Sequence, residues 1–163
     1  MKRNIGLRML ALIALTMFVA STAATAEGRA RCSLAGVAGD WGFTDSGSVL
    51  GVGPRIAVGR FTLDAAGRVL NGKATVNLNG TISSETFSGT TTVSADCTGS
   101  ATIELLDQSG NKFATITTAV VFVDNMREAR EIFTSVILAN GTPLATVITL
   151  DAKRLFVEHS NEQ

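Results

Sequence analysis

The chain has 163 residues, with 14 basic and 14 acidic side chains, a single histidine and no tyrosine. This length allows one domain with a sizeable core. The balanced charge, with no basic cluster, argues against nucleic acid or an anionic membrane surface as a partner. Because the lone histidine, His159, lies in a polar tail, most hydrolytic acid–base machinery is also disfavoured.

Residues 1–26 have the pattern of a cleavable signal peptide. Lys2, Arg3 and Arg8 precede an apolar run over Met9–Ala20, and Ala24-Thr25-Ala26 supplies the small-x-small pattern of a cleavage site. We therefore expect a secreted or periplasmic protein of 137 residues without a membrane anchor. We divide the mature chain into an N-terminal strap (27–40), a β-barrel domain (41–155) and a polar tail (156–163).

The mature chain reads as strands joined by turns. Apolar and polar residues alternate with a period of two, and Asp, Asn and Gly punctuate the segments. A Gly-rich connection is expected over 45–54, a segment between strands over 79–84, and a tight hairpin at Asn140-Gly141. The eight expected strands are 41–50, 57–63, 70–78, 85–93, 101–105, 112–123, 129–139 and 142–153.

Short turns leave no room for parallel crossovers, so the sheet should be an antiparallel meander. Eight such strands favour an all-β, up-and-down barrel, with a two-sheet sandwich as the alternative. The last three strands are apolar on both faces, which a barrel wall facing water should not be. We expect a homo-oligomer built on this wall, or else a terminal segment or a sandwich partner covering it.

The two cysteines, Cys32 and Cys97, are expected to form a disulfide. An exported chain favours that state, no histidine is near enough to suggest a zinc site, and Asp96 beside Cys97 disfavours a reactive thiolate. By strand parity Cys97 lies at the end of the barrel where the first strand starts. A Cys32–Cys97 bridge therefore requires residues 33–40 to cross and close this end, and leaves the opposite end as the mouth.

Alternation also selects the residues that should line the barrel interior. Glu85 has the same parity as Phe87 near the mouth, so it either points inward as a candidate acid or base, or lies solvated at the rim. No complete dinucleotide, phosphate or calcium motif occurs, so no cofactor and no metal are expected. The expected pocket residues are Phe61, Leu63, Val76, Leu78, Phe87, Ile103, Phe133 and Ile137.

Two segments, GRFTLDAAGRVLNG (59–72) and SGTTTVSADCTGSATI (88–103), resemble a group of uncharacterised, exported bacterial proteins. These proteins are likened to the allene oxide cyclase-type barrel, a calycin-like eight-stranded fold. The resemblance implies a barrel, and it is compatible with an oligomer. It transfers no catalytic residue, because the matching motifs are turns and barrel walls.

Three functions follow as hypotheses. The barrel binds a small hydrophobic or amphipathic ligand; or it is a cyclase or isomerase that uses the same pocket, with Glu85 as the reactive group; or it is a structural or interaction module whose interior is filled. An open interior would count against the third.

Overall fold

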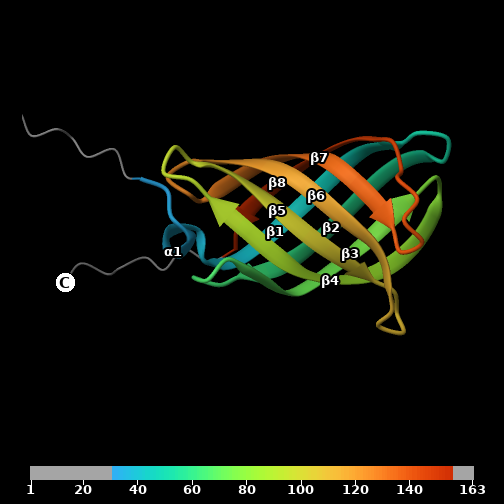
Figure 1. Cartoon of the computed structure of the whole chain (residues 1–163), viewed down its shortest axis with the longest axis horizontal. Coiled ribbons are helices and arrows are strands. Elements are labelled where there is room, and N and C mark those ends of the chain that lie inside the picture. The colour runs from blue at the N-terminus through green and yellow to red at the C-terminus, as the bar shows by residue number, and fades with distance from the viewer. Residues whose placement is uncertain (1–30, 156–163) are drawn as a thin grey trace, which may run out of the picture.

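A computed structural model describes residues 31–155 as a closed barrel of eight antiparallel strands, preceded by one helical turn (Figure 1). The predicted signal peptide, the first residues of the strap and the polar tail lie outside the described residues. The elements are α1 (Leu34–Val37), β1 (Gly39–Val49), β2 (Gly53–Leu63), β3 (Arg68–Leu78), β4 (Thr81–Val93), β5 (Thr98–Leu106), β6 (Lys112–Val123), β7 (Glu128–Leu138) and β8 (Thr146–Arg154).

Each strand pairs with the next one along the chain, and β8 pairs with β1 to close the ring. The predicted up-and-down barrel is thus confirmed, and the two-sheet sandwich is not formed. Closure gives every strand two neighbours, although β7 and β8 pair with each other only over residues 128–132 and 149–153. It also separates an inner face, where the hydrophobic core lies, from an outer face rich in Thr, Ser and charged residues.

The strands are longer at the mouth than the sequence predicted. The expected connection over 45–54 is wrong, because β1 continues to Val49 and β2 begins at Gly53. The expected segment 79–84 is a two-residue turn, Asn79-Gly80, after which β4 starts at once. Conversely, β8 begins at Thr146 rather than at residue 142, and Pro143 makes only an isolated bridge to Ile137.

Three irregularities interrupt the register of the barrel, and two of them, in β7 and in β3, change the expected orientation of apolar side chains. The register between β6 and β7 shifts at Thr117/Thr118, so that one extra residue, Thr134, separates Phe133 from Ser135. Because a bulge inverts the alternation beyond it, Val136 is buried and Ile137 is exposed. The predicted inward orientation of Ile137 is therefore wrong.

A second bulge lies in β3. The register with β2 and with β4 shifts around Asn71, which has a positive φ of 55°. Val69 is consequently buried, whereas Leu70 is only half-buried. The inner face continues beyond the bulge with Gly72, Ala74 and Val76.

The Cys32–Cys97 disulfide is present and closes one end of the barrel. The segment after Cys32 was expected to cross this end as an extended strap. It instead forms the helical turn α1, capped where Ser33 Oγ accepts a hydrogen bond from the Gly36 N–H at 3.1 Å. Val37 is fully buried, and its carbonyl accepts a hydrogen bond from Trp41 Nε1 at 3.0 Å, so α1 covers the indole ring.

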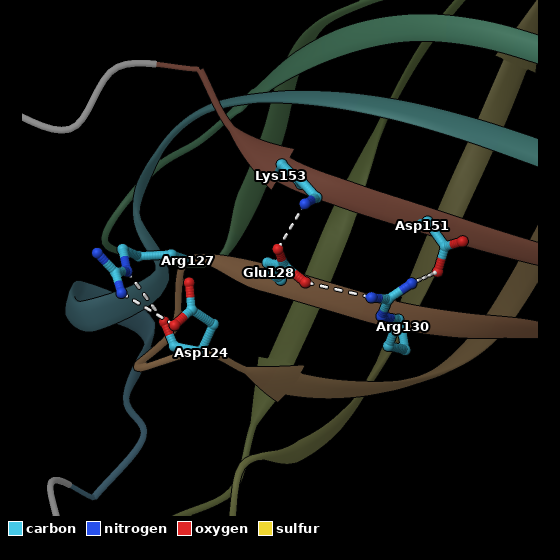
Figure 2. Close-up of polar contacts among 6 residues, drawn as sticks. All are labelled: Asp124, Arg127, Glu128, Arg130, Asp151 and Lys153. Atoms are coloured by element: carbon cyan, nitrogen blue, oxygen red, sulfur yellow. Dashed lines mark hydrogen bonds and ion pairs between the residues drawn. The ribbon is translucent and has the colours of Figure 1, made fainter.

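The outer surface beside α1 carries a chain of ion pairs on β7, β8 and the turn before β7 (Figure 2). Glu128 Oε1 lies 2.7 Å from Lys153 Nζ, and Glu128 Oε2 lies 3.2 Å from Arg130 Nη2. Arg130 Nη1 in turn lies 2.5 Å from Asp151 Oδ1. Exposed pairs of this kind contribute little to stability. They do show that charged, solvent-exposed side chains are concentrated at the closed end.

The outer face of the last three strands exposes apolar side chains, as the sequence predicted. Val121, Ile132, Ile137 and Val147 are each exposed. The homo-oligomer that we expected on this wall stays a prediction. Within residues 31–155, no helix is long and apolar enough to cross a membrane.

Candidate functional site

Three cavities succeed one another inside the barrel from the mouth to the closed end. The outer cavity, about 160 Å³, is lined mainly by apolar residues from the mouth ends of the strands, among them Val52, Leu78 and Leu144. The central cavity, about 70 Å³, lies among Phe43, Phe61 and Phe87. A floor cavity of about 20 Å³ adjoins Trp41. The interior is therefore not packed solid.

The outer and central cavities meet at a layer containing charged residues. Both cavities are lined by Arg55, Glu85, Leu105, Ile116 and Phe133. A cavity of roughly 150 Å³ holds a benzene ring, so the two cavities together have room for roughly ten non-hydrogen atoms. That is the size of a small organic molecule.

Most of the predicted pocket residues line these cavities. Phe61, Phe87, Ile103 and Phe133 line the central cavity, Leu63 lines the floor cavity and Leu78 lines the outer one. Val76 is buried in the core but lines none of the three. Ile137 lies outside the barrel.

A buried cluster of one arginine and two carboxylates forms the polar layer. Arg55 Nη2 donates to Asp45 Oδ2 at 3.3 Å, and it lies 3.6 Å from Glu85 Oε2. Asp45 is 2% exposed and Arg55 is 9% exposed. Glu85 thus points inward rather than into solvent at the rim.

The polar layer keeps unused hydrogen-bonding capacity. Among the described residues, Asp45 Oδ1, Arg55 Nε and Glu85 Oε2 are buried without a hydrogen-bond partner. An unmet buried donor or acceptor costs roughly 1–3 kcal/mol, so native interiors seldom leave three together. The cluster can therefore receive both a hydrogen-bond donor and an acceptor.

The Asp45 carboxyl is biased toward its protonated form. Burial raises its pKa, and the opposing effect of the Arg55 guanidinium only partly offsets this. The cluster therefore favours a neutral bound group that can both donate and accept a hydrogen bond.

A second carboxyl, Glu131, faces the same cavity from β7. Thr118 Oγ1 donates to Glu131 Oε2 at 2.7 Å, and Thr118 is 3% exposed. Glu131 lines both the central and the floor cavity. Burial raises the pKa of Glu131, and the single bond from Thr118 opposes this only in part.

Aromatic rings form much of the wall between these groups. Phe43, Phe61 and Phe87 contact one another with ring centroids 5.7–6.3 Å apart, and Trp41 stacks on Phe61 at 6.4 Å. Such walls accept flat, apolar ligand parts through ring-to-ring contacts.

Sequence reasoning found Glu85 but missed Asp45, Arg55 and Glu131. Asp45 lay in the stretch interpreted as a connection (45–54), and Arg55 lay between that stretch and the strand expected over 57–63. Their signal was opposite charge on the two strands that flank the turn at residues 50–52: Asp45 pairs with Ala57 and Arg55 pairs with Gly47, so the two side chains share one face of the hairpin two positions apart. Glu131 lies two residues before Phe133 and so has the same parity, which is the signal that could have placed it inside.

No family model matches this chain, and no curated protein matches it. A solved structure of EF1p2_mFAP2b bound to DFHBI is similar in fold, with a TM-score of 0.52 and 11% sequence identity. The similarity covers 76% of this chain and 99% of that chain. At this identity the likeness shows the fold: an eight-stranded antiparallel barrel of a kind that, in that protein, holds a small molecule.

Proposed function

We propose that this protein binds a small amphipathic molecule inside the barrel. The apolar part of the ligand occupies the outer cavity, and its polar group reaches the cluster of Arg55, Asp45 and Glu85. The observation that carries the proposal is this cluster, with three unpartnered polar atoms, at the junction of two cavities. The structural neighbour that binds DFHBI gives independent support for a barrel of this kind as a ligand container.

The cavities weigh against the hypothesis of a filled structural module. A barrel that served only as a scaffold would gain stability from complete packing, because each void forfeits contact energy. Here the largest void lies at the open end and leads to charged groups. This arrangement is typical of a binding site, in which a mostly apolar cleft contains a few polar groups.

Native mass spectrometry of protein purified from its own host tests the proposal. We expect a bound mass that organic solvent releases. Ala114 is 2% exposed and lines the outer cavity, so Ala114→Phe should fill the cavity and abolish the bound mass. Ala119 is exposed on the same strand, so Ala119→Phe is the matched control and should keep the ligand. Absence of any bound mass, together with an Ala114→Phe variant more stable than wild type, would contradict ligand binding.

A cyclase or isomerase that uses the same interior is the second candidate. The observation that favours it is that two carboxyls with raised pKa, Asp45 and Glu131, face one cavity lined mainly by apolar residues. A carboxyl with a raised pKa is a better proton donor partner for general acid–base chemistry than an exposed one. Incubation of the protein with a host lipid extract should then convert a compound without a change of mass, and Asp45→Asn should abolish the conversion.

We also propose export to an oxidising compartment, on the basis of the predicted signal peptide and the Cys32–Cys97 disulfide. The resemblance to the exported family with an allene oxide cyclase-like barrel remains part of this proposal. A homo-oligomer through the wall of β6 to β8 is proposed on the basis of its exposed apolar residues. Sedimentation velocity at micromolar concentration tests it, and a monomer would contradict it.

A further inference from the structure

The outer cavity, about 160 Å³, has charged groups only where it meets the central cavity. The described residues that line it are apolar apart from Arg55, Glu85 and Thr146. Arg55 and Glu85 also line the central cavity, so they lie at the junction of the two. Thr146 begins β8 at the mouth. A molecule that enters from the mouth therefore passes apolar walls before it reaches the charged pair.

Arg55 and Glu85 present one donor and one acceptor that no side chain of residues 31–155 uses. The donor is the N–H at Arg55 Nε, the acceptor is Glu85 Oε2, and both atoms are buried without a hydrogen-bond partner. Each of the two side chains is 11% exposed, so contact with bulk water is slight. Buried polar groups in proteins are nearly always partnered. The pair is thus complementary to one group that accepts from Arg55 and donates to Glu85.

This complementarity separates three kinds of ligand head group. An ionised carboxylate only accepts, and it would place a third carboxyl beside Arg55, which already faces Asp45 and Glu85. An ammonium only donates, so it would leave Arg55 Nε unpartnered next to a second cation. A hydroxyl or a primary amide both accepts and donates and has no net charge. A neutral head of this kind therefore meets both buried atoms.

The volume of the outer cavity limits the apolar part of the ligand. A cavity of roughly 150 Å³ holds a benzene ring, so the outer cavity has room for roughly seven non-hydrogen atoms. Val52 lines this cavity and is 46% exposed, so the cavity reaches the surface at the mouth. A longer apolar chain can extend past this rim, where Leu50 and Ile82 are exposed.

We infer that the outer cavity selects a neutral amphiphile that binds head first. A hydroxyl or primary amide head lies between Arg55 and Glu85, and an apolar part of about six carbons fills the cavity toward the mouth. The inference rests on the proposed function and narrows its ligand class to neutral alcohols and amides. It excludes carboxylic acids and amines that are ionised at neutral pH.

Four probes that share one chain test the head group by calorimetry at pH 7: hexan-1-ol, hexanamide, hexanoate and hexylamine. We expect the two neutral probes to bind about tenfold more tightly than the two ionised ones, which corresponds to one well-formed hydrogen bond. Butan-1-ol and octan-1-ol test the volume. Affinity should rise about fourfold per methylene from butan-1-ol to hexan-1-ol, and less from hexan-1-ol to octan-1-ol, because the last carbons lie at the rim.

Glu85→Gln tests the pair itself, because it keeps the size of the side chain, removes one acid beside Arg55 and adds a donor. The affinity for hexanoate, relative to that for hexan-1-ol, should rise about tenfold. Glu104→Gln is the matched control: it removes the same charge from an exposed side chain that pairs with Lys112, and it should leave this ratio unchanged. Thermal unfolding checks that both variants are folded, and the wild-type comparison decides if Glu85→Gln is not.

Equal affinities of wild type for all four heads, or a ratio that Glu85→Gln leaves unchanged, would overturn this inference and leave the proposed function standing. A bound mass in host-purified protein that binds none of the hexyl probes would do the same. Failure to bind any probe, with no bound mass in host-purified protein, would contradict both.

Discussion

The two ends of the barrel are built from different residues. The closed end has α1, the disulfide and the ion pairs around Glu128. The mouth is formed largely by uncharged stretches, residues 46–54, 74–84 and 132–150, and it exposes Leu50, Ile82 and Val147. The closed end thus contains the covalent cross-link and the charged, hydrated side chains. The mouth, by contrast, has an apolar rim around the outer cavity. The difference indicates that stability is concentrated at one end and access to the interior at the other.

Removal of the disulfide should have the largest effect on stability. Cys32 and Cys97 are 65 residues apart, and opening a loop of this length releases chain entropy worth about 4 kcal/mol. We expect Cys32→Ala/Cys97→Ala to lose about that free energy of unfolding in urea. A loss below about 1 kcal/mol would show that α1 and Trp41 hold the closed end without the cross-link.

Loss of Arg55 should have the next largest effect, and it probes the interior between the two ends. Arg55→Leu leaves Asp45 and Glu85 buried together without their cation, which should cost about 3 kcal/mol at pH 7. The matched control is Arg130→Leu, because Arg130 also contacts two carboxylates but is exposed; little change is expected there. The deficit of Arg55→Leu should shrink at low pH as the carboxyls become protonated. A deficit that grows would contradict this reading.

A pair of glycines gives a smaller contrast between the ends. Gly67, in a turn at the closed end, has φ of 82°, and a Cβ there would lie 2.5 Å from the Thr91 carbonyl oxygen. Gly80, in a turn at the mouth, has φ of 87° and open space around it. Gly67→Ala should therefore lower the free energy of unfolding by about 2 kcal/mol more than Gly80→Ala does. Gly80→Ala introduces backbone strain from the positive φ but no steric clash. Equal losses in thermal unfolding would mean that both ends are equally loosely packed.

Much of the fold could be predicted from the sequence because its signals are local. Alternation with a period of two and turn residues such as Asp64 and Gly67 locate all eight strands. In the structure, Asp64 Oδ1 accepts hydrogen bonds from the N–H groups of Ala66 and Arg68. Alternation cannot reveal a β-bulge, because the extra residue, here Thr134, looks in the sequence like any other residue of the strand. This is why the orientation of Ile137 was wrong.

The site could be predicted only in its apolar part. Apolar residues at inward parity, such as Phe61 and Phe87, indicate a lining directly. Charged residues at inward parity suggest a loop or a solvated face, because most charged side chains lie outside. Asp45 and Arg55 can be buried because they form an ion pair with each other and because Arg55 also lies beside Glu85. Glu85 comes from β4, further along the chain, so this partner is not visible in the local sequence.

Methyl NMR with hexan-1-ol tests the central claim, that the mouth leads to an internal binding site, most directly. We expect shift changes at Leu105, Ile116 and Leu150, which line the cavities, and none at Val37, the buried residue of α1. Ala114→Phe should reduce these changes, and Ala119→Phe should leave them intact. Changes confined to the outer-face residues Ile132 and Val147 would contradict the account, because they would place the probe on the outside of the barrel.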